Sequence, residues 1–270
     1  KDLRLTIDHR LQFIAYQALQ EAVAAHHADS GSVIVLDVKT GDILVDTNMP
    51  TYNPNNRKQL QPGVFRNRAL TDTFEPGSTM KPFTIALALM SDRYTPESTI
   101  DTNPGRMRVG GYEIKDDGLN YGVINLQQII QKSSNIGAAK ILLSLSPDDF
   151  WNLLRGLGFG IKTHSGFPGE VSGRLMSHPV WYPSDVATLA YGYGIAVTTL
   201  QLAQGYQILA NHGVSQPVTF IKRDKPSPGQ SVLSSDVADA VISMLETVVT
   251  SGTGTRAQVP GYRVAGKTGT

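Results

Sequence analysis

The order of the first secondary-structure signals constrains the fold of this chain more than any other feature. A helical repeat of apolar residues begins after Asp8 and continues to about Ala25. Two short β-branched runs follow, at 33–36 and 43–45, and a polar turn at 39–42 between them predicts a β-hairpin. A helix followed by a hairpin is typical of an α+β sheet protein.

The middle of the chain has a mainly helical pattern, preceded by a long loop over 48–72. The other predicted elements are helices near 79–90, 125–132, 135–145, 148–156, 184–191, 198–211 and 234–249, a small hairpin of 106–109 and 112–115, and strands near 217–223 and 262–269. Because strands lie at both ends of a helical middle, we expect one α+β domain over 1–270. It would contain an antiparallel sheet flanked by helices and a mostly helical subdomain.

Charge and composition exclude several classes of function. The chain has 24 Lys and Arg against 23 Asp and Glu, so it offers no positive field that would attract nucleic acid. The absence of cysteine removes thiol nucleophiles and thiolate metal sites, and no H-E-x-x-H pattern occurs. We therefore predict no metal and no cofactor. No apolar run reaches the roughly 20 residues of a transmembrane helix, and the start without Met leads us to expect a piece of a longer protein.

Ser78 and Lys81 form the first candidate pair for chemistry. Residues three apart on a helix share a face, so the hydroxyl and the amine would lie within hydrogen-bonding reach. A serine needs an acceptor for its proton before it attacks, and a lysine whose pKa is lowered by burial can be that acceptor. The simplest alternative is a serine helix cap with an exposed lysine, because S-x-x-K arises by chance about once in such a chain.

Two further polar clusters follow. Segment 133–135, Ser-Ser-Asn, lies at a helix junction, where these residues are also favoured as plain caps. Segment 267–270, Lys-Thr-Gly-Thr, ends the last predicted strand, where its glycine would let a ligand approach and its hydroxyls could bind a carboxylate. An earlier Lys-Thr-Gly at 39–41 is sufficiently explained by the turn of the first hairpin.

In this order the three clusters resemble the signature of the penicillin-binding proteins and related serine acyltransferases, which is S-x-x-K, S-D-N and K-T-G. The flanking residues are similar to those of class B penicillin-binding proteins, in particular the division-specific peptidoglycan D,D-transpeptidases of Gram-negative bacteria; they lie at 75–83, 132–137, 191–194 and 265–270. The resemblance implies a β-lactamase/transpeptidase-like fold in which further strands follow the Lys-Thr-Gly strand. We therefore expect a C-terminal continuation of at least two elements, and an upstream membrane anchor and pedestal domain.

The resemblance also implies a role for each residue. Ser78 would attack the carbonyl between the terminal D-alanines of a peptidoglycan stem peptide, with Lys81 as its base, giving an acyl-enzyme. Ser133, assisted by the charge of Lys267, would relay a proton to the departing D-Ala, and an amine of a neighbouring stem would complete the cross-link. The implied binding groups are Asn135 for the peptide amide, the backbone N–H groups of Ser78 and Thr270 for the oxyanion, Thr268 and Thr270 beside Gly269 for the carboxylate, and Tyr193 as a wall of the cleft.

The same resemblance implies partners and a location. The chain would be acylated by β-lactam antibiotics and would work with cell-division proteins, including a septal glycan polymerase. Its location would be the periplasmic face of the bacterial inner membrane, with the anchor outside this chain.

Several alternatives stay open at this point. A D,D-carboxypeptidase or a β-lactamase would share nearly all these residues, although no Glu precedes an Asn by four positions, as in class A β-lactamases. Segment 261–268 fits the P-loop pattern G-x-x-x-x-G-K-[ST] of a nucleotide-binding protein, but Pro260 precedes it and no helix is predicted after it. A non-catalytic cell-wall binding module would not need both Ser78 and Lys81.

Overall fold

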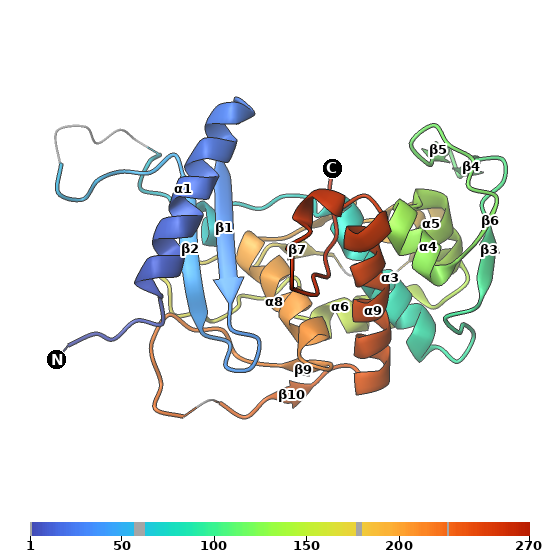
Figure 1. The fold of residues 1–270 in the computed structure, drawn as a ribbon. Helices are drawn as coiled ribbons and strands as arrows, with labels where there is room; N and C mark the ends of the chain where they lie inside the picture. Colours follow the sequence, from blue (N-terminus) through green and yellow to red (C-terminus); the bar gives the residue numbers. More distant parts are fainter. Residues whose placement is uncertain (1, 57–62, 177–179, 226) are drawn as a thin grey trace.

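The computed structural model describes the chain except residues 1, 57–62, 177–179 and 226. Helix α1 (His9–Ala25) lies across a hairpin of β1 (Gly31–Leu36) and β2 (Ile43–Met49), as Figure 1 shows. The N-cap prediction is confirmed, because the Asp8 carboxylate accepts hydrogen bonds from the first backbone N–H groups of α1. The first three predicted elements are therefore confirmed.

The helical middle is also confirmed, with small shifts at the ends of the helices. Its helices are α2 (Arg68–Thr71), α3 (Lys81–Met90), α4 (Leu126–Lys132), α5 (Asn135–Leu143), α6 (Pro147–Gly156), α7 (Pro183–Leu189), α8 (Thr199–Ala210) and α9 (Ser235–Ser251), with 3₁₀ turns η2 (Gly77–Met80) and η3 (Thr255–Ala257). Helix α2 lies inside the predicted long loop of 48–72, of which 57–62 are outside the described residues.

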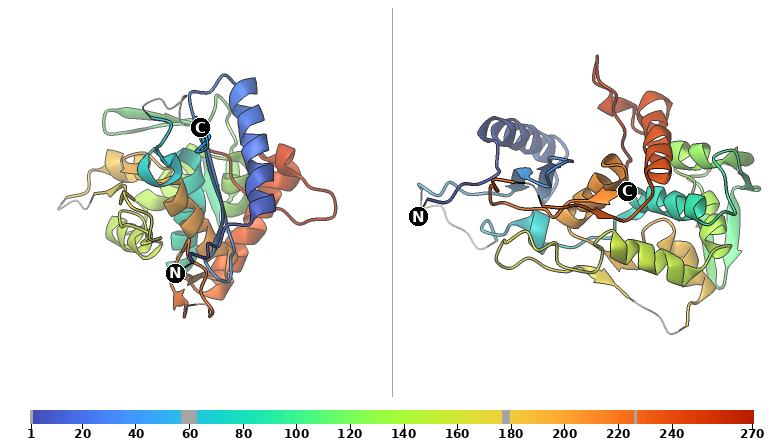
Figure 2. Two further views of the ribbon diagram at one scale, coloured as in Figure 1. Left: turned by 90° about the vertical axis from the view of Figure 1, so that its left-hand side faces the viewer. Right: turned by 90° about the horizontal axis from the view of Figure 1, so that it is seen from below.

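Helix α3 runs through the centre of the main core. It is apolar nearly all round, and a helix of that kind is stable only where other elements cover every face. Helices α5, α6, α8 and α9 supply that cover, and Figure 2 shows the compact arrangement from two further sides. The Phe83 ring packs edge-on against Phe159 and Tyr206, with 5.5 Å between ring centroids in each pair. The first residue of α3, Lys81, is thereby held in the interior.

The strands form five separate two-stranded antiparallel sheets in the part of the chain that the structure describes. Besides β1–β2, the pairs are β3 (Thr99–Asp101) with β6 (Val123–Asn125), β4 (Arg106–Val109) with β5 (Tyr112–Lys115), β7 (Arg174–Leu175) with β8 (Ile195–Ala196), and β9 (Val214–Ser215) with β10 (Gln230–Ser231). The predicted hairpin β4–β5 is confirmed. The α+β class is confirmed, with several small sheets in place of a single large one among the residues that the structure describes.

Two predicted strands are wrong. Segment 217–223 makes only single-residue bridges, Thr219 with Asp42 and Ile221 with Leu5. Its backbone hydrogen bonds go to two short stretches, 4–6 and 41–43, which give it no continuous ladder. Segment 262–269 forms no strand, because no neighbouring strand among the described residues offers it a ladder; Gly266 N–H bonds instead to the Leu245 carbonyl of α9. Among all the residues that the structure describes, no helix is long and apolar enough to span a membrane.

A buried carboxylate fastens the loop between α6 and β7. Glu170 accepts four hydrogen bonds, from the hydroxyls of Thr163 and Ser165 and from the backbone N–H groups of His164 and Ser165, at 2.6–3.1 Å. Burial would raise the pKa of Glu170, but these hydrogen bonds outweigh it and hold the pKa below its usual value of 4.5.

We expect Glu170→Gln to lower the free energy of unfolding by about 2 kcal/mol at pH 7, because a neutral amide replaces two charge-assisted acceptors and brings a donor against donors. Because the folded-state pKa is depressed, the wild-type advantage is present above pH 4.5 and is lost as the pH falls through the folded pKa. Thermal unfolding at several pH values measures the difference, with the exposed Glu97→Gln as the control. A gap that stays constant down to pH 3 would contradict this assignment.

Candidate active site

The Ser78 hydroxyl and the Lys81 amine are brought together as predicted. Ser78 lies in the 3₁₀ turn η2, and Lys81 is the first residue of α3, with Pro82 in the first turn, where its missing N–H costs no helical bond. Lys81 is completely buried (0% exposed), and its Nζ lies 2.9 Å from Ser78 Oγ. The alternative of an exposed lysine is therefore wrong.

Ser133 and Asn135 face the same amine from the junction of α4 and α5. Lys81 Nζ is 2.6 Å from the Ser133 carbonyl, 3.0 Å from Ser133 Oγ and 2.7 Å from Asn135 Oδ1. Ser133 ends α4 in the left-handed conformation (φ 61°), which is sparsely populated for a residue with a side chain and is often found at functional sites. The Asn135 amide is oriented by its other end, because its Nδ2 donates to the Lys115 carbonyl at 2.9 Å.

These contacts decide what the amine of Lys81 can do. The Ser133 carbonyl and Asn135 Oδ1 can only accept, so together they take two N–H bonds of the amine. A neutral amine has two N–H bonds and one lone pair, and the lone pair is then left for the hydroxyls of Ser78 and Ser133. Burial and then the charge of Lys267 lower the pKa of Lys81 to about 7, against the opposing effect of Asp116 and Asp117. Neutral Lys81 is therefore well populated near neutral pH.

Lys267 approaches Ser133 from the opposite side. Its Nζ is 3.0 Å from Ser133 Oγ and 3.4 Å from Thr268 Oγ1. The Ser133 hydroxyl thus lies between two lysine amines, each at 3.0 Å. Burial, partly offset by the Asp117 carboxylate, lowers the pKa of Lys267 to about 8. Lys267 is therefore the more strongly cationic of the two lysines at neutral pH.

Two glycines allow segment 267–270 to lie against the turn that carries Ser78. A Cβ atom on Gly77, which has φ 56°, would come within 2.8 Å of the Thr270 carbonyl oxygen. A Cβ atom on Gly269 would lie 3.0 Å from Thr79 and 3.3 Å from the Pro76 carbonyl. The close approach requires glycine at position 77 and leaves little room for a side chain at position 269, and it places Thr268 and Thr270 beside the serine.

A cleft of about 320 Å³ lies over this cluster. Its lining includes Ser78, Ser133, Asn135, Tyr193, Thr268 and Thr270. The Tyr193 wall is tied to the nucleophile turn: Gly77 N–H bonds to the Gly192 carbonyl, and Gly194 N–H bonds to the Glu75 carboxylate at 3.0 Å. The structure thus brings together all nine residues that the sequence nominated, although their segments lie far apart in the chain.

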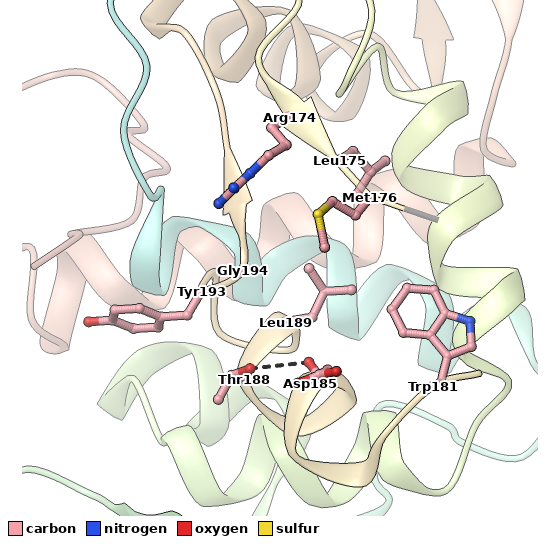
Figure 3. Close-up of a pocket in the computed structure, with 9 residues that line it drawn as sticks. All are labelled: Arg174, Leu175, Met176, Trp181, Asp185, Thr188, Leu189, Tyr193 and Gly194. Atoms are coloured by element: carbon pink, nitrogen blue, oxygen red, sulfur yellow. Dashed lines mark hydrogen bonds between the residues drawn. The ribbon is translucent and has the colours of Figure 1, made fainter. Parts of the chain in front are cut away.

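A second, smaller cavity of about 180 Å³ shares Tyr193 with the cleft. Figure 3 shows Met176 and Leu189 in its middle, with Tyr193 and Trp181 at opposite ends. Tyr193 therefore lines both the polar cleft and a more apolar cavity.

Sequence reasoning missed three polar residues at the site. Asp117 and Thr253 line the cleft, and Thr253 Oγ1 lies 2.9 Å from Thr268 Oγ1. Asp116 is buried beneath the α4–α5 junction and binds it. Asp116 and Asp117 follow the predicted 112–115 strand, and Thr253 follows helix α9. A pair of acids after a hairpin gives no signal of which distant element it will meet.

The fold and this site define a class of protein, in which a serine next to a buried lysine lies between helices and a Lys-Thr-Gly segment. The chain matches the penicillin-binding protein transpeptidase domain over residues 31–270. It is 39% identical over its full length to the peptidoglycan D,D-transpeptidase FtsI of Escherichia coli and 41% identical to the protein of Pseudomonas aeruginosa named "Probable peptidoglycan D,D-transpeptidase PbpC". This chain belongs to the transpeptidase domain family of the penicillin-binding proteins.

Solved structures agree with this assignment. The transpeptidase domain of penicillin-binding protein 3 from Burkholderia pseudomallei superposes with a TM-score of 0.89 and 42% identity, over 97% of this chain and 76% of that one. The chain covers 45% of the FtsI sequence and 48% of the PbpC sequence, so it spans about half the length of these relatives.

The P-loop hypothesis for 261–268 is wrong. A P-loop joins a strand to a helix whose N-terminus binds phosphate, whereas this segment contains neither a strand nor a helix and continues to Thr270 without one. Its lysine, Lys267, donates to Ser133 Oγ in the cleft.

Proposed function

We propose that this chain is the catalytic domain of a peptidoglycan D,D-transpeptidase that works through a serine acyl-enzyme and is acylated by β-lactams. One observation carries the proposal: the buried Lys81 amine lies within 3.0 Å of both the Ser78 and the Ser133 hydroxyls. A lysine held there with a pKa near 7 can take a proton from one hydroxyl and return it through the other.

In the first half-reaction, Ser78 Oγ bonds to the carbonyl carbon between the two terminal D-alanines, and its proton passes to Lys81 Nζ. The backbone N–H groups of Ser78 and Thr270 receive the oxyanion. When the C–N bond breaks, the D-Ala nitrogen takes the proton of Ser133 Oγ, and Lys81 replaces that proton and becomes neutral again. The charge of Lys267, with the hydroxyls of Thr268 and Thr270, holds the departing carboxylate.

In the second half-reaction, a neutral amine of a neighbouring stem peptide attacks the ester carbon. The new C–N bond forms as the bond to Ser78 Oγ breaks, and the proton lost by the amine returns to Ser78 Oγ through Ser133 and Lys81. Asn135 binds the amide of the acylated peptide, and Tyr193 forms one wall of the cleft. Each half-reaction leaves Lys81 and Ser133 in their starting protonation states, and the second restores the hydroxyl of Ser78.

We infer further that the chain is one domain of a longer, membrane-anchored protein at the periplasmic face of the inner membrane, with divisome proteins and a septal glycan polymerase as partners. The greater length of the relatives and the name FtsI among them support this inference.

The test is a partition experiment with an acyl-D-alanyl thioester as donor and a D-amino acid as amine acceptor. We expect mass spectrometry to detect the amide product in a yield that rises with amine concentration. Free acid alone, whatever the amine concentration, would instead identify a D,D-carboxypeptidase. Rapid turnover of a β-lactam, without a lasting adduct, would identify a β-lactamase.

A further inference from the structure

Asp116 is a buried carboxylate (1% exposed) that the proposed mechanism leaves without a role. It follows β5, and its oxygens accept three hydrogen bonds from consecutive residues at the start of α5. Oδ2 accepts from Ser134 Oγ at 2.7 Å, and Oδ1 accepts from the backbone N–H groups of Asn135 and Ile136 at 2.6 and 3.0 Å. The side chain thus joins the β4–β5 hairpin to the α4–α5 junction.

The residues that Asp116 binds lie next to the contacts of Lys81. Ser133 precedes Ser134 and presents its carbonyl and hydroxyl oxygens to the amine, and Asn135 presents Oδ1. Asn135 is held at both ends by consecutive residues of the hairpin, since Lys115 O accepts from its side chain and Asp116 accepts from its backbone N–H. Its position relative to Lys81 therefore depends on this attachment.

A simple helix cap does not account for this arrangement. The Ser134 hydroxyl already caps α5 by accepting from Gly137 N–H at 2.9 Å. Asp116 adds a buried negative charge from another element, which is costly unless every lone pair is used. A buried charge that is held by several hydrogen bonds makes its surroundings rigid, and this is typical of a group that fixes the geometry of a site.

We propose that Asp116 is a positioning residue for the active site: its carboxylate holds the α4–α5 junction so that Ser133 and Asn135 meet Lys81, and it places a fixed negative charge near that amine. The inference rests on the proposed function, because it assigns Asp116 a part in the acylation of Ser78.

The charge gives the proposal a signature that a purely structural residue would lack. The charged groups that act on Lys81 are Lys267, which lowers its pKa, and Asp116 and Asp117, which raise it. If acylation requires neutral Lys81, the acid limb of its pH profile follows the pKa of that lysine. Removing the anion at position 116 makes the protonated lysine less stable, so the limb moves to lower pH.

The experiment compares Asp116→Ala and Asp116→Asn with wild type, using the rate of acylation by a β-lactam from pH 5 to 9, corrected for the folded fraction. We expect Asp116→Ala to slow acylation about 100-fold by displacing Asn135. Asp116→Asn should lose less, because its amide oxygen can still accept two N–H bonds, and both variants should shift the acid limb to lower pH. The matched control is Asp149→Ala, which removes an exposed acid from the first turn of α6.

The outcomes distinguish failure of the proposed transpeptidase function from failure of the positioning role of Asp116. If wild type is not acylated, the proposed function itself fails. If wild type is acylated and folded Asp116 variants match it in rate, or lose rate without moving the acid limb, the positioning role is overturned. If Asp116→Ala does not fold, the profile of Asp116→Asn decides alone.

Discussion

No covalent β-lactam adduct should form on Ser78→Ala, whereas the wild-type chain should gain the mass of one β-lactam. The variant lacks the Oγ atom proposed to form the ester, and loss of a serine nucleophile costs roughly 10⁶-fold in related chemistry. The fold should survive, because Lys81 keeps the Ser133 and Asn135 oxygens as partners. Intact-protein mass spectrometry measures the adduct directly.

The control for this prediction is Ser235→Ala, which removes an exposed hydroxyl at the start of α9 and should leave the adduct unchanged. An adduct on Ser78→Ala at the wild-type rate would mean that another hydroxyl is the nucleophile. Peptide mapping of that adduct would then identify the residue.

Lys81→Met should slow acylation by roughly 10²- to 10⁴-fold, because Ser78 would lose the acceptor of its proton. Met is similar in length to Lys, but the Ser133 carbonyl and Asn135 Oδ1 lose their donor. Because both acceptors are only partly buried and line the cleft, their loss of a partner should together lower the free energy of unfolding by about 1–3 kcal/mol. Stopped-flow acylation kinetics and thermal unfolding together separate the catalytic loss from the structural one.

The pH dependence of the acylation rate provides a second test of the role of Lys81. Protonated Lys81 has no lone pair to accept a proton, so wild-type acylation should fall as the pH drops below about 7. It should fall again above about 8, as Lys267 loses the charge that binds the carboxylate. The acid limb should vanish in Lys81→Met and persist in Lys39→Met, an exposed lysine of the first hairpin. A wild-type rate that stays flat from pH 5 to 8 would contradict the role of Lys81 as base.

Periodic signals predicted the long elements well, and their failures have a physical cause. The helical repeat after Asp8 and the pattern leading into α9 are local properties, so the sequence carried them in full. A strand exists only with a partner, and segment 262–269 has the apolar composition of a strand without a ladder among the described residues.

The residues of the site also differ in whether local sequence or the tertiary fold determines their contacts. Ser78 and Lys81 are three residues apart, so helix geometry alone predicts their contact. Ser133, Asn135 and Lys267 were nominated by their resemblance to a family signature, and only the fold supplies the distances that join them. Asp116 belongs to no signature, and its contacts with 134–136 depend on how one hairpin packs against one helix junction.

The contact between Gly192 and the nucleophile turn has a mechanical consequence. A Cβ atom on Gly192 would lie only 2.1 Å from the Gly77 carbonyl oxygen, and the Gly77 N–H bonds to the Gly192 carbonyl. With Glu75 bound to Gly194, the wall that carries Tyr193 and the turn that carries Ser78 are fastened to each other through their backbones. A bulky ligand therefore cannot push this wall aside without dragging the nucleophile out of register, so accommodation of different ligands must come from the opposite boundary of the cleft.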